Sequence, residues 1–309
     1  MLSFKNLIDI DDLSLKDIEI ILENADTFSD VLERDLKKVP ALRGKTVLTM
    51  FFEPSTRTRN SFELAAKRLG ADTVSFAAAT SSLRKGEFII DTIKTMQSMV
   101  VDLIIIRHSD SGAVNFISKY IETPIINAGD GKHQHPTQAL LDLYTIKKTF
   151  GSFKNLKAAI VGDILNSRVA RSNIILFNKV GIETTIVTSS ILKPENFDYF
   201  NVKTATNIEE VLPFVDIIYM LRMQFERQDR KYYPSIKEYN SFLSIDEKRF
   251  SLMKENAIIM HPGPVNRGIE ISEGLMNIKD ESKIKINQQV RNGLAIRMAL
   301  IYLMCLKQD

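Results

Sequence analysis

The densest cluster of polar side chains occupies residues 54–59, where the sequence reads Pro-Ser-Thr-Arg-Thr-Arg. It follows an apolar run, 46–52, that predicts a buried strand, and it opens a segment with helical periodicity. A helix start offers unpaired N–H groups and a positive dipole end, which favour an anion, and Arg57 adds a planar fork that matches phosphate oxygens. The side chains that we expect to bind a phosphate are Ser55, Thr56, Arg57 and Thr58. Arg59 lies two residues further on, so we expect it to make a structural ion pair instead.

Two more polar segments follow predicted strands in the first half of the chain. Arg107 ends the β-branched run 103–107, although an arginine in that place is also compatible with a simple surface charge. The turn-rich loop 127–138 ends in His135 and Gln138, which lie three residues apart and share one face of the helix that begins there. Such a pair can hydrogen-bond a carbonyl and its amide, while a helix cap is the simpler interpretation of His135.

A loop at residues 80–87 carries Ser81 and Lys85 between a predicted strand and a predicted helix. Both side chains can donate hydrogen bonds to an anion. Residue types alone, however, favour a solvated loop at this place.

The second half repeats the pattern with side chains that suit carboxylates. Arg168 follows a strand-to-helix turn, and Arg222 and Gln224 end another strand, where residues two apart point the same way. Bidentate contacts to a carboxylate and ordinary salt bridges both remain open for these arginines. A stiff turn, His261-Pro-Gly-Pro264, follows the last predicted strand, and its carbonyls can accept from an amine.

Short β-branched runs alternate with helical periodicity along the whole chain, which is typical of α/β layers. Ser14 and Asp17 predict a capped helix at the N-terminal end, and a short polar break at 151–154 separates two such series. We therefore predict an α/β fold of two doubly wound parallel-sheet domains. The long polar segment 224–244 is expected to be a functional loop.

Composition excludes several classes of protein. The 309 residues are 44% hydrophobic and 26% charged with a net charge of +3, which does not indicate disorder or a nucleic-acid surface. The single Cys305 cannot form an intrachain disulfide or a cysteine cage, so we expect a reducing, cytoplasmic setting and no metal. The acidic N-terminal sequence and the short apolar runs predict neither a signal peptide nor a membrane span. No P-loop or complete dinucleotide motif occurs, so the expected anion is a small phosphate compound without a cofactor.

These motifs, in this order along nearly the whole chain, resemble those of the aspartate carbamoyltransferase (aspartate transcarbamoylase) family, catalytic chain. The matching segments are 52–59, 85–87, 107–108, 127–131, 134–138, 162–163, 222–224 and 261–264. The sequence has neither the His-Cys-Leu-Pro turn nor the Ser-Met-Gly signature of ornithine carbamoyltransferases. Gly263 is a small departure, because family members usually have Leu or Ala between the two prolines.

The resemblance implies transfer of the carbamoyl group of carbamoyl phosphate to the α-amine of L-aspartate, in de novo pyrimidine (UMP) biosynthesis. It implies that the residues that act in catalysis are Arg57, Thr58, Arg107, His135 and Lys85. Those that bind carbamoyl phosphate would be Ser55, Thr56, Arg57, Thr58, Ser81, Lys85, Arg107, His135, Gln138, Gly263 and Pro264. Those that bind aspartate would be Lys85, Arg168, Arg222 and Gln224.

The resemblance also implies a division into domains and an assembly. Residues 1–136 with 288–309 would bind carbamoyl phosphate, and 137–287 would bind aspartate, with 137–150 as a crossing helix. The active site would lie in the cleft between these two domains. Ser81 and Lys85 would reach the site of a neighbouring chain in a homotrimer. Regulatory subunits and dihydroorotase subunits are both compatible partners. The resemblance also implies a cis peptide bond between Gly263 and Pro264.

Three alternatives remain to be compared with this interpretation. A carbamoyltransferase for ornithine or another amine would keep the phosphate motifs and change the second half. A catalytically silent binding or scaffold subunit would lack one of the anion-binding residues, all of which are present. A nucleic-acid-binding protein would show a basic stripe with interleaved aromatic residues, which this sequence does not have.

Overall fold

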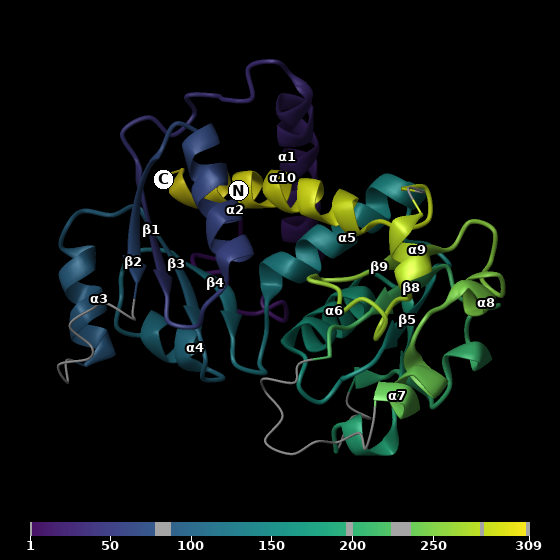
Figure 1. Cartoon of the computed structure of the whole chain (residues 1–309). Coiled ribbons are helices and arrows are strands. Elements are labelled where there is room, and N and C mark those ends of the chain that lie inside the picture. Colours follow the sequence, from purple (N-terminus) through teal and green to yellow (C-terminus); the bar gives the residue numbers. More distant parts are fainter. Residues whose placement is uncertain (1, 78–87, 196–199, 224–235, 279–280, 307–309) are drawn as a thin grey trace. The chain divides into compact units, whose positions relative to one another are not determined.

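The computed structural model describes residues 2–77, 88–195, 200–223, 236–278 and 281–306 (Figure 1). The chain divides into two compact units, unit 1 with Met1–Tyr144 and Arg291–Asp309, and unit 2 with Thr145–Val290. Each unit contains a parallel sheet with helices, so the α/β fold class predicted from the sequence is confirmed. The domain bounds at residues 136/137 and 287/288 stay a prediction.

The sheet of unit 1 has the strand order β2-β1-β3-β4, and all its pairs are parallel. Its strands are β1 (Thr46–Phe51), β2 (Asp72–Ala77), β3 (Leu103–His108) and β4 (Ile125–Asp130). The first four residues of β3 read Leu-Ile-Ile-Ile, and they are fully buried. Such a continuous apolar run is typical of a parallel strand with both faces covered.

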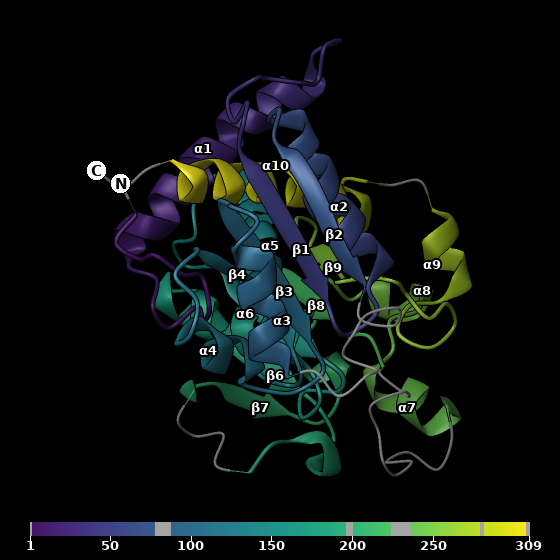
Figure 2. The ribbon, with the colours of Figure 1, turned by 90° about the vertical axis from the view of Figure 1, so that its left-hand side faces the viewer.

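Helices of unit 1 pack around this sheet. They are α1 (Leu15–Glu33), α2 (Thr56–Arg68), α3 (Ile89–Gln97), α4 (Ala113–Ser118), α5 (Pro136–Phe150), which continues into unit 2, and α10 (Ile286–Cys305), most of which lies in unit 1. The capping box predicted from Ser14 and Asp17 is confirmed, because each residue's side chain accepts a hydrogen bond from the other's backbone N–H, at 3.1 and 3.0 Å. Figure 2 shows α2 alongside β1 and β2.

Helix α10 brings the end of the chain back to unit 1. Tyr302 of α10 meets Phe28 of α1 edge to face, with ring centroids 5.5 Å apart. Arg297 of α10 lies over the Phe62 ring of α2, at 5.1 Å from its centroid. The helix begins at Ile286, two residues before the segment 288–309 that was expected to return to the first domain.

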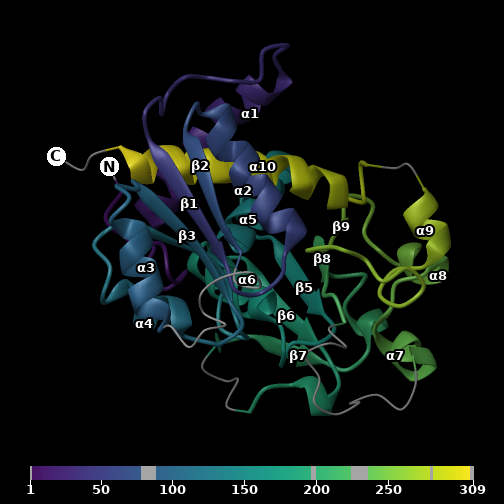
Figure 3. The same ribbon diagram turned by 60° about the vertical axis from the view of Figure 1, so that its left-hand side comes forward.

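Unit 2 contains a second parallel sheet with the order β7-β6-β5-β8-β9 (Figure 3). Its strands are β5 (Lys157–Val161), β6 (Glu183–Val187), β7 (Lys203–Ala205), β8 (Ile217–Met220) and β9 (Ile258–Met260). Its helices are α6 (Arg168–Lys179), α7 (Ile236–Leu243), α8 (Glu247–Phe250) and α9 (Glu273–Asn277), with 3-10 turns at Ser190–Leu192 and Ile208–Glu210.

One expectation for unit 2 is wrong, and one of its strands was not predicted. The segment 224–244 is not one long loop, because α7 forms from Ile236 and buries Tyr239 against the core of the unit. Strand β7 was not predicted, because the strand is only three residues long and largely exposed. No helix in the described part of the chain is long and apolar enough to cross a membrane.

Both sheets contain a point where the order of the strands reverses. In unit 1 the chain leaves β1 toward β2 and later returns to β3 on the other side of β1. In unit 2 it leaves β5 toward β6 and returns to β8 on the other side of β5. Open parallel sheets bind ligands beyond the carboxyl ends of the two strands at such a point. The residues that follow β1, β3, β5 and β8 are therefore the candidates for a ligand-binding site.

Candidate active site

The strand-order reversal of unit 1 brings together the two phosphate candidates of the first half. The N–H of Phe52, just after β1, donates to the carbonyl of Arg107 in β3 at 2.8 Å. The chain then turns through Pro54 and enters α2 at Thr56. Arg107 and the start of α2 thus lie at the same edge of the sheet, beyond neighbouring strands.

The first turn of α2 presents polar groups outward. Ser55 is the N-cap residue, and among the described residues its side chain makes no capping hydrogen bond. Thr56 and Arg57 are exposed, while Thr58 is half-buried. The backbone N–H groups of a first helical turn have no partner within the helix. This turn can therefore offer backbone donors, hydroxyl groups and a guanidinium to one anion.

Arg107 is held in place by two contacts on its own unit. Its Nη2 lies 3.1 Å from Oε2 of Glu53, and its Nη1 donates to the carbonyl of Ala128 at 3.2 Å. Only 8% of the residue is exposed. A charged fork fixed by a carboxylate and a carbonyl loses little entropy when it binds a ligand oxygen.

Arg59 makes the structural ion pair that its spacing predicted. Its Nε lies 3.6 Å from Oε1 of Glu63, one turn along α2. The same Glu63 oxygen accepts from the Ser75 hydroxyl of β2 at 2.7 Å. Glu63 therefore ties α2 to the edge strand of the sheet, and Arg59 neutralises its charge.

The loop between β4 and α5 is fixed by a buried carboxylate that the sequence did not single out. Asp130 accepts hydrogen bonds from Asn127 Nδ2 at 2.9 Å and from the N–H of Gly112 at 2.8 Å, and it lies 3.1 Å from His133 Nδ1. Burial alone would raise the pKa of Asp130, but hydrogen bonds from His133 and Asn127 hold that pKa below its usual value. An ionised carboxylate thus anchors the loop that leads into α5.

His135 and Gln138 lie at the end of this anchored loop. They are 4% and 8% exposed, and the N–H of Gln138 donates to the carbonyl of His135 at 3.0 Å. His133, in the same loop, lies between Asp130 and Asp9. In the sequence, Asp130 stands out only by its position between two glycines of a turn. That position does not by itself indicate a role.

The strand-order reversal of unit 2 holds Arg168 and Arg222. The N–H of Leu221 donates to the carbonyl of Val161 at 2.8 Å, so the residues after β5 and β8 lie side by side. Ser167 caps α6 by accepting from the N–H of Ala170 at 3.1 Å, and Arg168, next in sequence, is 3% exposed. Arg222 is half-buried.

Gly162 allows the close approach of these two segments. It has a positive φ of 121°, and a Cβ there would lie 2.9 Å from Tyr239 Oη and 3.3 Å from Leu221 Cβ. The turn that follows is closed by Asp163, whose Oδ1 accepts from Asn166 N–H at 3.1 Å and from Asn166 Nδ2 at 3.0 Å. Only glycine fits this position without displacing the β8 end.

A second buried carboxylate, Glu270, joins the segment that follows β8 to the His261-Pro-Gly-Pro264 turn that follows β9. Its Oε1 accepts from the N–H of Met223 at 2.8 Å, and its Oε2 lies 3.8 Å from Nε2 of His261. His261 Nδ1 in turn accepts from the N–H of Gly263 at 2.7 Å, and the Gly263–Pro264 bond is cis, as the resemblance implied. Burial raises the pKa of Glu270.

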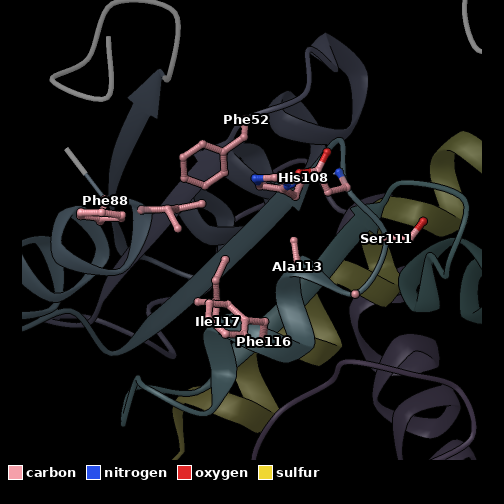
Figure 4. Close-up of a pocket in the computed structure, with 10 residues that line it drawn as sticks. Phe52, Phe88, His108, Ser111, Ala113, Phe116 and Ile117 are labelled. Atoms are coloured by element: carbon pink, nitrogen blue, oxygen red, sulfur yellow. Dashed lines mark hydrogen bonds and ion pairs between the residues drawn. The ribbon is translucent and has the colours of Figure 1, made fainter. Parts of the chain in front are cut away.

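A cavity of about 610 Å³ lies beside the predicted phosphate residues in unit 1 (Figure 4). Phe52, Phe88 and Phe116 line it, with His108, whose ring lies 5.3 Å from that of Phe52. None of the described candidate site residues lines this cavity. Its lining is mostly apolar and includes the carboxylate of Asp110, so it does not suit a doubly charged phosphate compound.

The described candidates of unit 1 that follow β1 and β3, and those of unit 2 that follow β5 and β8, lie at the strand-order reversals of their own units. His135 and Gln138 instead follow the outer strand β4, and Gly263 and Pro264 follow the outer strand β9. Three predicted site residues, Ser81, Lys85 and Gln224, lie outside the described residues. Within the described ranges, no group of three or more His, Cys, Asp or Glu side chains could hold a metal ion.

Comparison with protein families matches both units in turn. The family model described as aspartate/ornithine carbamoyltransferase, carbamoyl-P binding domain, matches residues 5–148. The model described as aspartate/ornithine carbamoyltransferase, Asp/Orn binding domain, matches residues 154–304. Together they account for nearly the whole chain.

Similar proteins of known name and structure extend this match. The chain is 51% identical to the aspartate carbamoyltransferase catalytic subunit of Moorella thermoacetica, over 97% of each chain. It is similar to the crystal structure of aspartate transcarbamoylase from Trypanosoma cruzi in complex with N-(phosphonacetyl)-L-aspartic acid, with a TM-score of 0.89 and 30% sequence identity. The match covers 97% of this chain and 96% of that chain. A structure of the Trypanosoma cruzi enzyme in complex with carbamoyl phosphate and aspartate also has a TM-score of 0.89, with 29% identity and 97% coverage of both chains.

Proposed function

The chain belongs to the aspartate/ornithine carbamoyltransferase family, and from that premise we propose that it is an aspartate carbamoyltransferase. It transfers the carbamoyl group of carbamoyl phosphate to the α-amine of L-aspartate, which gives N-carbamoyl-L-aspartate and phosphate. The observation that carries this proposal is the pair of strand-order reversals, one in each unit, each followed by arginine side chains. Two anionic substrates need two such sites.

Unit 1 binds carbamoyl phosphate. The phosphate is held by the start of α2 and by cations, with the proposed residues Ser55, Thr56, Arg57, Thr58, Ser81, Lys85 and Arg107. Arg107, Thr58 and His135 polarise the carbamoyl carbonyl. Gln138 holds the carbamoyl amide, and the Gly263–Pro264 backbone contributes further contacts to this substrate. The family description of residues 5–148 as a carbamoyl-P binding domain supports this assignment.

Unit 2 binds L-aspartate. Arg168 and Arg222 pair with its two carboxylates, helped by Gln224 and by Lys85. A guanidinium matches a carboxylate in a bidentate way, so two arginines favour a dicarboxylic amine over ornithine, whose side chain is cationic. The names of the similar proteins support aspartate over ornithine, which the family description leaves open.

The chemistry needs orientation and fixed charge, and no covalent intermediate with the protein. The neutral α-amine attacks the carbamoyl carbon, and a tetrahedral state forms with negative charge on its oxygen. The C–O bond to phosphate then breaks, and the departing phosphate takes up the proton that the amine loses. Donors already in place around that oxygen stabilise the charge without reorganising. Arg107, held by Glu53 and Ala128, is such a donor.

The active unit of this enzyme is a homotrimer in which Ser81 and Lys85 serve a neighbouring chain. An isolated chain would then lack part of its site and be inactive. Regulatory or dihydroorotase subunits are compatible additional partners. The product would enter pyrimidine (UMP) biosynthesis in the cytoplasm.

Phosphate release from carbamoyl phosphate tests the proposal. We expect release to depend on L-aspartate and to saturate with it. Arg168→Lys keeps the charge but loses the bidentate fork, so the KM for aspartate should rise about tenfold or more while that for carbamoyl phosphate changes little. Release that is indifferent to L-aspartate would contradict the proposal.

A further inference from the structure

Gln138 has a buried hydrogen-bond partner, Asp142. Its Nε2 donates to Oδ1 of Asp142 at 3.0 Å, one turn further along α5. Asp142 is fully buried, and Gln138 is 8% exposed. The spacing of four residues places both side chains on the same face of the helix.

The chemistry of Asp142 fixes which end of the Gln138 amide faces it. An ionised carboxylate has only acceptor oxygens, whereas the glutamine amide has an oxygen acceptor at one end and an NH₂ donor at the other. The NH₂ end must therefore face Asp142. The amide oxygen Oε1 is then directed to the opposite side of the amide group, where it can accept a hydrogen bond.

The positive charge of Arg297 attracts the carboxylate of Asp142. The Nη1 of Arg297 donates to the Ser61 hydroxyl of α2 at 2.8 Å, and its guanidinium lies over the Phe62 ring. Burial lowers the pKa of Arg297 to about 10, with Asp142 acting in the opposite direction, so this side chain stays a cation at neutral pH. A permanent cation beside a buried carboxylate favours the charged form of that carboxylate.

We propose that Asp142 is a positioning residue that sets selectivity for the carbamoyl group by holding the Gln138 oxygen toward the carbamoyl NH₂. This inference rests on the proposed function, in which Gln138 contacts that group. Carbamoyl phosphate and acetyl phosphate carry the same phosphate and differ in having NH₂ or CH₃ on the carbonyl carbon. An acceptor oxygen forms a hydrogen bond only with the former, and a methyl group would leave it unpaired.

Asp142→Asn should remove this selectivity at constant side-chain volume. The positive charge of Arg297 attracts the new amide's oxygen, so its NH₂ turns to Gln138, and Gln138 reverses to accept from it. The Gln138 NH₂ then faces the substrate NH₂, donor against donor. The change of buried charge acts on both phosphate compounds alike, so the ratio of their affinities isolates the effect on the amide.

The experiment measures the inhibition constant of acetyl phosphate and the KM of carbamoyl phosphate in the assembled protein, and takes their ratio. We expect Asp142→Asn to lower that ratio about tenfold, the value of one hydrogen bond, with the inhibition constants of inorganic phosphate and acetyl phosphate moving together. Asp17→Asn is the matched control, because Asp17 is another buried carboxylate of unit 1, in the α1 capping box. It should leave the ratio unchanged.

A reciprocal variant, Gln138→Glu with Asp142→Asn, exchanges the two groups and conserves the charge of the pair. The carboxylate introduced at position 138 has only acceptor oxygens, so one oxygen accepts from the amide introduced at position 142 and the other faces the substrate. We expect the ratio to recover toward that of the unchanged protein, and this test still applies if Asp142→Asn alone does not fold. An unchanged ratio in folded Asp142→Asn, or no recovery in the reciprocal variant, would overturn the inference.

Gln138→Ala separates this inference from the proposed function. If Gln138 contacts the carbamoyl amide, this variant lowers the ratio by itself, and adding Asp142→Asn to it changes the ratio no further. If Gln138→Ala leaves the ratio unchanged, the proposed role of Gln138 fails together with the inference. If it lowers the ratio but Asp142→Asn does not, only the inference fails.

Discussion

Arginine side chains that follow β-strands make up much of the proposed site, and their surroundings differ. Arg107 is fixed by Glu53 and Ala128, whereas Arg57 is exposed at the first turn of α2. At this scale, residue types and spacing can predict which role a side chain plays. The ion pair between Arg59 and Glu63 confirms one such prediction. The sequence could not predict that Gln138 bonds to Asp142, because the cation that favours the ionised carboxylate comes from α10, far along the chain.

Arg57→Ala should reduce kcat/KM for carbamoyl phosphate about a thousandfold, or ~4 kcal/mol, because it removes a charged donor from the phosphate. Steady-state phosphate release measures this effect. Arg68→Ala, in the last turn of the same helix, is the matched control and should change kcat/KM less than about twofold. Equal losses in both variants would mean that Arg57 acts through the stability of α2 alone.

Asp9 makes stability depend on pH. Burial raises its pKa to about 6 from its ordinary value of 3.8, with the charge of His133 acting in the opposite direction. A raised carboxyl pKa contributes stability that is complete below pH 3.8 and is lost as the pH rises through about 6. Asp9→Asn keeps the group neutral, so it should be more stable than the unchanged protein at pH 7, by about 1 kcal/mol after allowance for partial exposure.

Denaturant unfolding at pH 4 and pH 7 measures this difference. Asp35→Asn removes the same charge from an exposed position and serves as the control. A stability gain in Asp9→Asn that is no larger at pH 7 than at pH 4 would contradict the assignment.

At the scale of elements, the loops that follow strands hold the site, and their glycines and carboxylates fix their course. The strands with continuous apolar runs were predictable, since both faces of a parallel sheet are covered. Strand β7 and helix α7 were not predicted. Strand β7 is short and exposed, and α7 lies in a polar segment from which Tyr239 and Leu243 pack on the core. Asp130 and Glu270 also escaped prediction, because their roles depend on backbone N–H groups from distant segments, Gly112 and Met223.

Gly131→Ala tests the loop between β4 and α5. Gly131 has a φ of 44°, and a Cβ there would lie 2.4 Å from the Ser111 N and Oγ atoms, so the substitution combines backbone strain with a clash. We expect a loss of about 3 kcal/mol in the free energy of unfolding. Gly44→Ala, with a φ of 84° and open space around its Cβ, should lose only about 1 kcal/mol. Equal losses of unfolding free energy in the two variants would show that close packing around Gly131 does not hold the loop in place.

At the scale of the whole molecule, the proposed assembly gives each chain two roles, one in its own site and one in its neighbour's. Chains with Arg57→Ala and with Lys85→Ala should each be inactive as homotrimers. Mixed after dissociation in equal amounts, they should regain activity, because a site that takes Arg57 from one chain and Lys85 from the other is intact in about a quarter of cases by random assortment. Remixing that yields no activity, although hybrid trimers are demonstrated by size and mass, would contradict a shared site.

The account depends most on the identity of the amine that receives the carbamoyl group. Incubation of the assembled protein with isotope-labelled carbamoyl phosphate and equal concentrations of L-aspartate and L-ornithine, followed by chromatographic identification of the labelled product, measures that identity directly. We predict N-carbamoyl-L-aspartate as the labelled product, because Arg168 and Arg222 would match the two carboxylates of aspartate. Label recovered only in carbamoylated ornithine would contradict the account.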